Sequence, residues 1–332
     1  MPWLVAASAC LAVLLLIAPL KGWLQSRAVL DRPNRRSSHK APVPRGAGLV
    51  VVPVAVAAWA VLAGIAGPNA IVALSALLLA AITWIDDLRG LAVLPRLAVQ
   101  CLAVLAALLV LPKDALVFQG WLPLLLDRAA TALLWLWFVN LYNFMDGIDG
   151  LTGIATTTIP GGAALVLWIA GDAGGPKAEA LALAAAAVGF LAWNWPPARI
   201  FLGDVGSIGL GFLVGWLLLR VAAEGLWAAA LLLPLYHLGD ATLTLGLRLA
   251  KGDRVWVASR VHFYQRGAAA YGRHAPVLLR ITGVKLGLVA LAGLATAMPE
   301  LALPAVMAGG LIVLGALWYF AGAARRVGDA AR

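Results

Sequence analysis

Apolar stretches of about 17 to 22 residues recur along the whole chain, and each is long enough to cross a lipid bilayer as a helix. Of the residues, 63% are hydrophobic and 12% charged, with a mean hydropathy of +0.94, which is far more apolar than a water-soluble domain can bury. These runs predict an all-α integral membrane protein, a bundle of about 11 transmembrane helices that forms a single domain over residues 1–332. The predicted helices span residues 3–20, 47–66, 70–85, 96–112, 127–142, 151–170, 178–195, 207–223, 226–247, 281–297 and 302–320.

The basic residues predict how this bundle is oriented. If the N-terminus is periplasmic, the loops split Lys and Arg 20 to 4 in favour of the cytoplasm, with Lys285 inside a helix. The positive-inside rule therefore predicts a periplasmic N-terminus and a cytoplasmic C-terminus in a bacterial inner membrane. It also accounts for the net charge of +10, because basic loops face anionic lipid, so no nucleic-acid partner is expected.

Five aspartates lie on the predicted cytoplasmic face, each within a few residues of an apolar span: Asp86, Asp87, Asp146, Asp149 and Asp204. A carboxylate near the bilayer is costly, so its presence needs a reason. Single interfacial aspartates cap helices or pair with arginine, but five on one face favour a function. Clustered carboxylates with amides nearby are the ligands that Mg²⁺ prefers, so the sequence predicts a magnesium site in the cytoplasmic loops.

Three segments concentrate this chemistry. The first, Asn140 to Leu151, carries Asn140, Asn143, Asp146 and Asp149 among glycines, and its spacing does not match a calcium-binding EF-hand loop. The second, Phe201 to Ser207, places Asp204 between glycines before a predicted helix, where free N–H groups suit a phosphate. The third, Ser259 to Arg266, joins Arg260, His262 and Arg266, which suit phosphate binding and proton transfer.

Together these motifs resemble the polyprenyl-phosphate N-acetylhexosamine-1-phosphate transferases (glycosyltransferase family 4), which include the muramoyl-pentapeptide phosphotransferase of peptidoglycan synthesis. The resemblance covers nearly the whole chain. It rests on the motifs Asp31 to Gly48, Asp86 and Asp87, Asn143 to Leu151, Gly203 to Ser207 and Arg260 to Arg266.

The resemblance implies ten or eleven transmembrane helices and a cytoplasmic active site that joins a UDP-N-acetylated sugar to undecaprenyl phosphate, releasing UMP. It implies Mg²⁺, with Mn²⁺ as a substitute, bound by Asp204 first and Asp149 next. Substrate binding falls to Asn140, Asn143, Asp146, Arg260, Arg266, Ser38, His39 and Arg45, and the catalytic residues are Asp86, Asp87 and His262.

One departure from the family motif bears on which sugar the enzyme would transfer. Many relatives carry a run of histidines where this chain reads His262-Phe263-Tyr264-Gln265. That form resembles the initiators of O-antigen synthesis in lipopolysaccharide that use 6-deoxy sugars such as N-acetylfucosamine or N-acetylquinovosamine. The choice between these sugars and N-acetylglucosamine or N-acetylgalactosamine stays open, as does a homodimer.

Two mechanisms and one other class of protein remain as alternatives. Direct displacement needs an ionised lipid phosphate, whose last proton Asp86 or Asp87 accepts, whereas a two-step route would place the phospho-sugar on Asp204. A secondary transporter of an anionic substrate would use His237 and Asp240 within the membrane. The simpler hypothesis for these two residues is a hydrogen-bonded pair one helical turn apart, or Asp240 facing Arg248.

Overall fold

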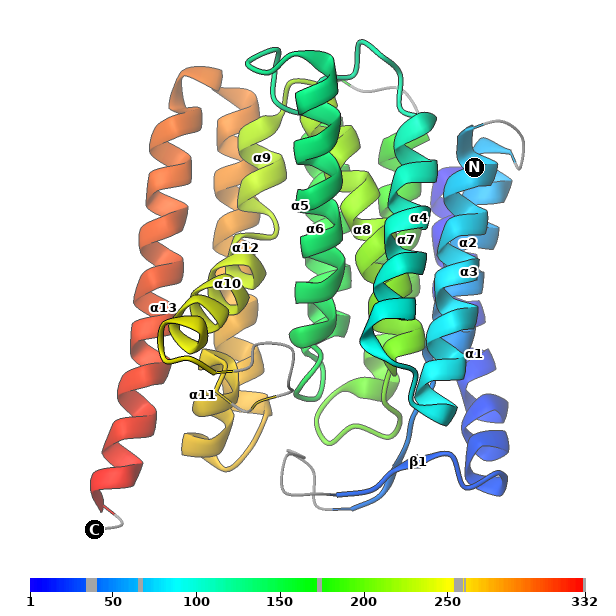
Figure 1. Ribbon diagram of the computed structural model, residues 1–332, viewed down its shortest axis with the longest axis vertical. Coiled ribbons are helices and arrows are strands. Elements are labelled where there is room, and N and C mark those ends of the chain that lie inside the picture. Colours follow the sequence, from blue (N-terminus) through cyan, green and yellow to red (C-terminus); the bar gives the residue numbers. More distant parts are fainter. Residues whose placement is uncertain (34–40, 65–67, 172–174, 254–258, 260, 331–332) are drawn as a thin grey trace.

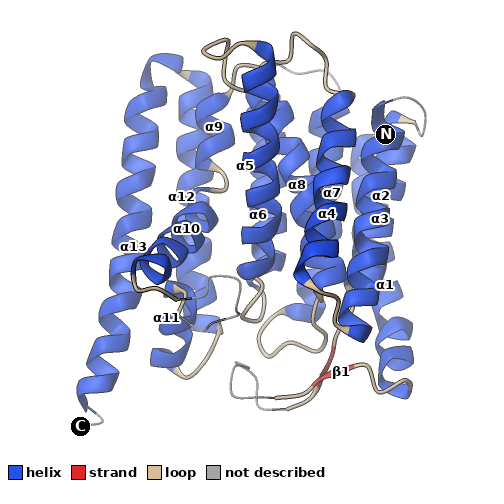
Figure 2. Cartoon of the chain, in the orientation of Figure 1, coloured by secondary structure: helices blue, strands red, loops and turns tan. Residues whose placement is uncertain are grey.

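The computed structural model describes residues 1–33, 41–64, 68–171, 175–253, 259 and 261–330, and it is almost entirely helical (Figure 2). Most helices run along one common direction and form a bundle (Figure 1). The elements are, in chain order, α1 (Pro2–Ser26), β1 (Leu30–Asp31), β2 (Val43–Pro44), α2 (Gly48–Ala63), α3 (Pro68–Arg89), α4 (Val93–Leu109), α5 (Leu124–Phe144), α6 (Leu151–Ile169), α7 (Gly175–Asn194), α8 (Asp204–Ala223), α9 (Trp227–Leu232), α10 (Leu235–Ala250), α11 (Phe263–Tyr271), α12 (Ala275–Ala297), the 3₁₀ turn η1 (Pro299–Leu301) and α13 (Ala302–Ala330).

Eight helices in the described part of the chain are long and apolar enough to cross a membrane. They are α1, α3, α5, α6, α7, α8, α12 and the segment Pro299–Ala324, which joins η1 to most of α13. Two more apolar helices, α2 and α4, are shorter. The chain is therefore built as an integral membrane protein, as its hydropathy predicts, while the count of 11 spans stays a prediction.

Helix α8 lies at the centre of the bundle, and nearly all of its side chains are buried. Glycines allow this close packing. A Cβ built on Gly215 would lie 2.3 Å from the indole nitrogen of Trp135 on α5, and one built on Gly211 would lie 3.0 Å from the Cβ of Tyr142. Small residues four apart let neighbouring helices approach closely in a membrane, so α8 can be surrounded on all sides.

The predicted helix over residues 226–247 is wrong in one respect, because it is two helices, α9 and α10, separated by a turn at Leu233 and Pro234. Proline lacks a backbone N–H, and its ring crowds the preceding turn, which favours a break. A further short helix, α11, lies in the region between residues 248 and 280 that was predicted to be a loop. Both differences matter to function, since α10 and α11 carry Asp240 and the residues that follow His262.

The two ends of the bundle differ. In Figure 1, α1 begins at the upper end and α13 ends at the lower end, where β1 and α11 also lie. β1 and β2 form a short antiparallel pair in which Leu30 faces Pro44 and Asp31 faces Val43. The loops after α3, α5 and α7 reach the same lower end, so the polar segments picked out from the sequence gather there.

Candidate active site

One arginine joins two of the predicted carboxylates. A single guanidinium nitrogen of Arg45 lies 2.6 Å from Asp87 on α3 and 2.6 Å from Asp204 at the start of α8. The side chain of Asp87 is only 3% exposed and that of Asp204 is 22% exposed, so the pair opens to solvent on the side of Asp204.

Backbone hydrogen bonds bring Arg45 to this position. The N–H groups of Gly46 and Ala47 donate to the carbonyl of Phe201, that of Gly48 donates to Leu202, and that of Phe201 donates back to Pro44. A Cβ on Gly48 would lie 2.3 Å from the Cα of Gly206, so only glycine lets α2 begin this close to α8. The motif around residue 45 and the motif around residue 204 are thus parts of one structural unit.

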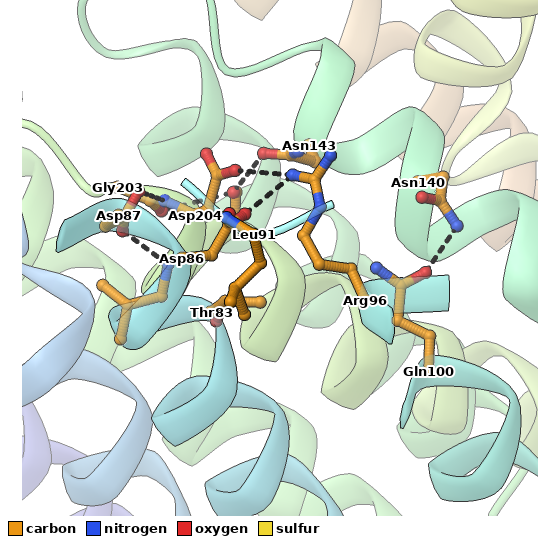
Figure 3. Close-up of polar contacts among 12 residues, drawn as sticks. Thr83, Asp86, Asp87, Leu91, Arg96, Gln100, Asn140, Asn143, Gly203 and Asp204 are labelled. Atoms are coloured by element: carbon orange, nitrogen blue, oxygen red, sulfur yellow. Dashed lines mark hydrogen bonds and ion pairs between the residues drawn. The ribbon is translucent and has the colours of Figure 1, made fainter. Parts of the chain in front are cut away.

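Asp87 also holds the first turn of α8. Its carboxylate accepts hydrogen bonds from the backbone N–H groups of Asp204 at 3.3 Å and Val205 at 3.1 Å. These N–H groups have no partner within the helix, and a carboxylate at a helix N-terminus is further stabilised by the helix dipole. Asp87 therefore fixes where Asp204 lies (Figure 3).

Arg96 of α4 is a member of the cluster that we did not predict. Its guanidinium lies 2.7 Å from Asp86 and 3.6 Å from Asp204, as Figure 3 shows. Asp86 also accepts a hydrogen bond from the backbone N–H of Leu91. A signal was present in the sequence, because Arg96 is a cation at the start of an apolar run opposite two aspartates.

The cluster of Asp86, Asp87, Asp204, Arg45 and Arg96 contains three carboxylates and two guanidinium groups. Burial disfavours the charge of Arg45, but the carboxylates of Asp204 and Asp87 outweigh it and raise its pKa. With one carboxylate in excess, the cluster is a place where a further cation would be stabilised.

Asp146 lies between the cluster and α6. Its carboxylate accepts a 2.6 Å hydrogen bond from the Thr152 hydroxyl. Burial raises the pKa of Asp146 to about 6, the Thr152 hydrogen bond opposes this rise, and the charge of Asp204 adds to it. Ionisation of Asp146 therefore destabilises the folded protein.

Because the ionised carboxylate destabilises the fold, Asp146→Asn should make the protein more stable, by an amount that depends on pH. The raised pKa favours the folded state most at low pH, and this stability is lost as the pH rises from the ordinary value of 3.8 through about 6. We expect Asp146→Asn to unfold at a higher temperature than the wild type at pH 8, with the difference closing toward pH 4. Thermal unfolding in detergent across this range measures it, with the exposed Asp114→Asn as the control. If the wild type and Asp146→Asn unfolded at the same temperature at pH 8, the ionised Asp146 would not destabilise the folded protein.

The two predicted amides, Asn143 and Asn140, both lie on α5. Asn143 accepts a 2.6 Å hydrogen bond from Ser207 of α8, which places it one helical turn from Asp204. Asn140 donates to Gln100 of α4 at 2.7 Å, and Figure 3 shows this pair beside Arg96. Both amides therefore line α5 where it faces the charged cluster.

Asp149 makes different contacts. Its carboxylate lies 3.2 Å from a ring nitrogen of His274 and accepts a hydrogen bond from the backbone N–H of Ala198 at 3.0 Å. The contacts of Asp204 are instead with Arg45 and Arg96. The two residues predicted to bind a metal together thus have separate sets of partners in the described structure.

His262 is buried just before α11, where its Nδ1 lies 3.2 Å from Asp240 of α10. The predicted pairing of His237 with Asp240 is wrong, because neither ring nitrogen of His237 has a hydrogen-bond partner among the described residues. Arg266 donates to the carbonyl of Val261 and lies over the ring of Phe263. The sequence pointed to Asp240 only for the transporter alternative and for a pairing with His237 or Arg248, so its contact with His262 was not predicted.

Three predicted substrate-binding residues, Ser38, His39 and Arg260, lie outside the described residues. They remain predictions.

The cluster can be tested for its fit to Mg²⁺. No group of three or more His, Cys, Asp or Glu side chains in the described ranges is arranged to hold a metal. Mg²⁺, however, is often bound by one or two carboxylates, with water and substrate phosphates completing its octahedron. Asp87 and Asp204 meet this requirement, because they already share one cationic nitrogen at 2.6 Å. Their donor chemistry therefore fits Mg²⁺.

Comparison with known proteins agrees with the motifs. The model of glycosyl transferase family 4 matches residues 69–222, which include Asp86, Asp87, Asn143 and Asp204. A probable undecaprenyl-phosphate N-acetylglucosaminyl 1-phosphate transferase of Bacillus subtilis (strain 168) is 26% identical over 287 residues, which cover 79% of this chain and 76% of the relative. A phospho-N-acetylmuramoyl-pentapeptide-transferase of Synechococcus sp. (strain CC9605) is 31% identical over 242 residues, which cover 64% of this chain and 67% of the relative. The chain belongs to glycosyl transferase family 4, and it is a membrane enzyme that transfers a phosphosugar.

Proposed function

We propose that this enzyme transfers an N-acetylated amino-sugar 1-phosphate from a UDP-sugar to undecaprenyl phosphate, releasing UMP. The observation that carries the proposal is the cluster of Asp86, Asp87 and Asp204 with Arg45 and Arg96 at one end of a membrane bundle. Both relatives are named as transferases that act on such compounds, one on undecaprenyl phosphate and an N-acetylglucosaminyl 1-phosphate, the other on a phospho-N-acetylmuramoyl pentapeptide.

The product would begin an O-antigen or another glycan of the cell envelope. The segment His262-Phe263-Tyr264-Gln265 supports a 6-deoxy amino sugar as the substrate. We place the active site on the cytoplasmic side of the inner membrane, because the lower end of the bundle in Figure 1 carries the loops with most of the Lys and Arg residues.

Charge neutralisation is the main task of such a site, because a lipid phosphate must approach a sugar diphosphate and both are anions. Arg96 and Arg45 reach the carboxylates from α4 and from the segment before α2, and each can turn a guanidinium nitrogen toward a phosphate oxygen. Asn143 and Asp146 border the same space and would hold the nucleotide. His262 and Arg266 would address the diphosphate from the side of α11.

Mg²⁺, with Mn²⁺ as a substitute, would be held by Asp204 and by Asp87, which shares Arg45 with it, with Asp149 as the further ligand predicted from the family motif. When bound, the cation would neutralise charge on the diphosphate and stabilise the departing UMP. The carboxylates and guanidinium groups of the chain would orient the two substrates and hold them next to each other.

The contacts favour Asp86 over Asp87 as the base in direct displacement. Both oxygens of Asp87 accept backbone hydrogen bonds from the start of α8, whereas Asp86 is held by Arg96 and one backbone N–H. When Arg96 binds a substrate phosphate, Asp86 becomes free to accept the proton of the lipid phosphate.

This assignment predicts different pH profiles for two neighbouring variants. A phosphate monoester has its second pKa near 6, so at higher pH the lipid phosphate is already ionised and needs no base. Asp86→Asn should recover part of its lost rate as the pH rises from about 6 to 9. Asp87→Asn should keep a constant deficit, because it loses a contact that positions Asp204. Initial rates of both variants across this pH range test the prediction. If only Asp87→Asn recovered activity at high pH, Asp87 would be the base and Asp86 would not.

The overall reaction is tested with the purified protein, undecaprenyl phosphate and a panel of UDP-N-acetylated sugars, following UMP release. The panel contains the 6-deoxy sugars N-acetylfucosamine and N-acetylquinovosamine beside N-acetylglucosamine and N-acetylgalactosamine. UMP release that requires both substrates supports the proposed function. Failure of every sugar in the panel would contradict the donor class, and release with N-acetylglucosamine alone would contradict the 6-deoxy assignment.

A further inference from the structure

Asp240 on α10 is a fully buried carboxylate at the junction with α11. One oxygen lies 3.2 Å from Nδ1 of His262 and accepts a hydrogen bond from the backbone N–H of Phe263 at 3.1 Å. The other accepts a hydrogen bond from the backbone N–H of Tyr264 at 2.9 Å. One side chain of α10 thus binds three consecutive residues at the start of α11.

We propose that Asp240 is a positioning residue that orients His262 toward the substrate. An ionised carboxylate can only accept hydrogen bonds, so its contact places the proton of the imidazole on Nδ1. Nε2 is then the nitrogen presented to a substrate. The two backbone hydrogen bonds fix the residues that follow His262, so the direction of the ring is set by α10 and not by the loop before it.

The same junction reaches the nucleotide side of the site. The hydroxyl of Tyr264 donates to the carbonyl of Phe144 at 3.1 Å, at the end of α5. A Cβ on Gly147 would lie 2.2 Å from that hydroxyl, so glycine at this position lets the loop between α5 and α6 close over Tyr264. Asp240 therefore positions α11 against the loop that carries Asp146 and Asp149 as well as orienting His262.

The inference rests on the proposed function for the role of His262, but its geometry can be measured separately. The chain has only 4 histidines, so selective ¹⁵N labelling of histidine followed by NMR can resolve the ring nitrogens of His262 in the full-length protein. A His262→Gln sample identifies its signals. We expect the tautomer with the proton on Nδ1 in the wild type and a mixture of tautomers in Asp240→Asn.

Kinetics test the consequence for the reaction. Loss of a carboxylate that orients a functional histidine lowers activity by about 10- to 100-fold in comparable metal sites. We expect Asp240→Asn to lower kcat by a factor in this range while KM for both substrates changes less than about twofold. In a His262→Gln background, the same substitution should lower kcat no further, because the group that it orients is already absent.

Asp127→Asn is the matched control. Asp127 is also a fully buried carboxylate that accepts two backbone hydrogen bonds, from Val117 and Phe118, but it lies near the start of α5, about 24 Å along that helix from Asn143. Asp127→Asn should lose about as much stability as Asp240→Asn but keep the kcat of the wild type.

These measurements distinguish a positioning role of Asp240 from a purely structural one, and they separate this inference from the proposed function. Equal loss of kcat in Asp240→Asn and Asp127→Asn, or an undiminished effect of Asp240→Asn in the His262→Gln background, would show a purely structural role and overturn the inference. A wild-type spectrum with the proton on Nε2 would overturn it as well. If the wild type releases no UMP with any donor, the proposed function fails, whereas the spectrum still decides whether Asp240 orients His262.

Discussion

Asp204→Asn is expected to lower the rate of transfer by about 100- to 1000-fold, because it removes the most exposed carboxylate of the charged cluster. The amide keeps the size of the side chain and the helix start at Gly203, so folding should be close to normal. It cannot provide the negative charge that would hold Mg²⁺ beside Asp87. UMP release at saturating substrate measures the loss, and the exposed Asp114→Asn serves as the control.

Three results would change this interpretation of Asp204. Near-normal rates in Asp204→Asn would remove the residue from the active site. Wild-type activity that persists in EDTA would remove the metal, while leaving the role of the arginines intact. Isolation of a radiolabelled phospho-sugar attached to Asp204 would instead support the two-step route, in which this carboxylate is the nucleophile.

Arg45→Gln is expected to have the second largest effect, and it should lower both stability and turnover. Removal of the guanidinium leaves Asp87 and Asp204 facing each other without their shared cation, and an unpaired buried charge is strongly destabilising. The loss of a phosphate-binding donor should also reduce kcat by about 100-fold or more. Thermal unfolding and UMP release measure the two effects.

Added Mg²⁺ gives this variant a sharper test. If the cation binds between Asp87 and Asp204, millimolar Mg²⁺ should restore more thermal stability to Arg45→Gln than to the wild type, because it replaces the missing positive charge. Arg89→Gln is the control, since Arg89 is an exposed cation at the same end of α3. Equal stabilisation of all three proteins would argue that Mg²⁺ does not bind between these carboxylates.

Hydropathy predicted most helices closely, because a helix that crosses lipid must be apolar along most of its length. Helix α6, for example, was expected over 151–170 and spans Leu151–Ile169. The break at Pro234 could not be predicted in the same way. Pro53 and Pro160 lie inside α2 and α6 without ending them, so proline alone does not decide where a membrane helix stops. Helix α11 was missed because it is short and not uniformly apolar.

The site shows what the sequence can and cannot specify. The aspartates stood out because charge near a membrane is costly, and Asp86, Asp87 and Asp204 do lie together around Arg45 and Arg96. Their contacts did not stand out, although Arg45 was already expected as a substrate-binding residue. Helix α8 was expected to begin at residue 207, but it begins at Asp204, where a carboxylate of α3 binds its first N–H groups. A cap supplied by a residue 118 positions away leaves no local pattern in the sequence.

The long-range contact between Arg45 and Asp204 has a consequence for biogenesis. The two residues are 159 positions apart, so a ribosome must deliver α8 into the bilayer before the carboxylate finds its partner. The earlier segment around Gly46 and Ala47 must wait for the carbonyl of Phe201 with its N–H groups satisfied by water or by other partners. The contacts of Arg45 with α8 can therefore form only after most of the chain has been synthesised.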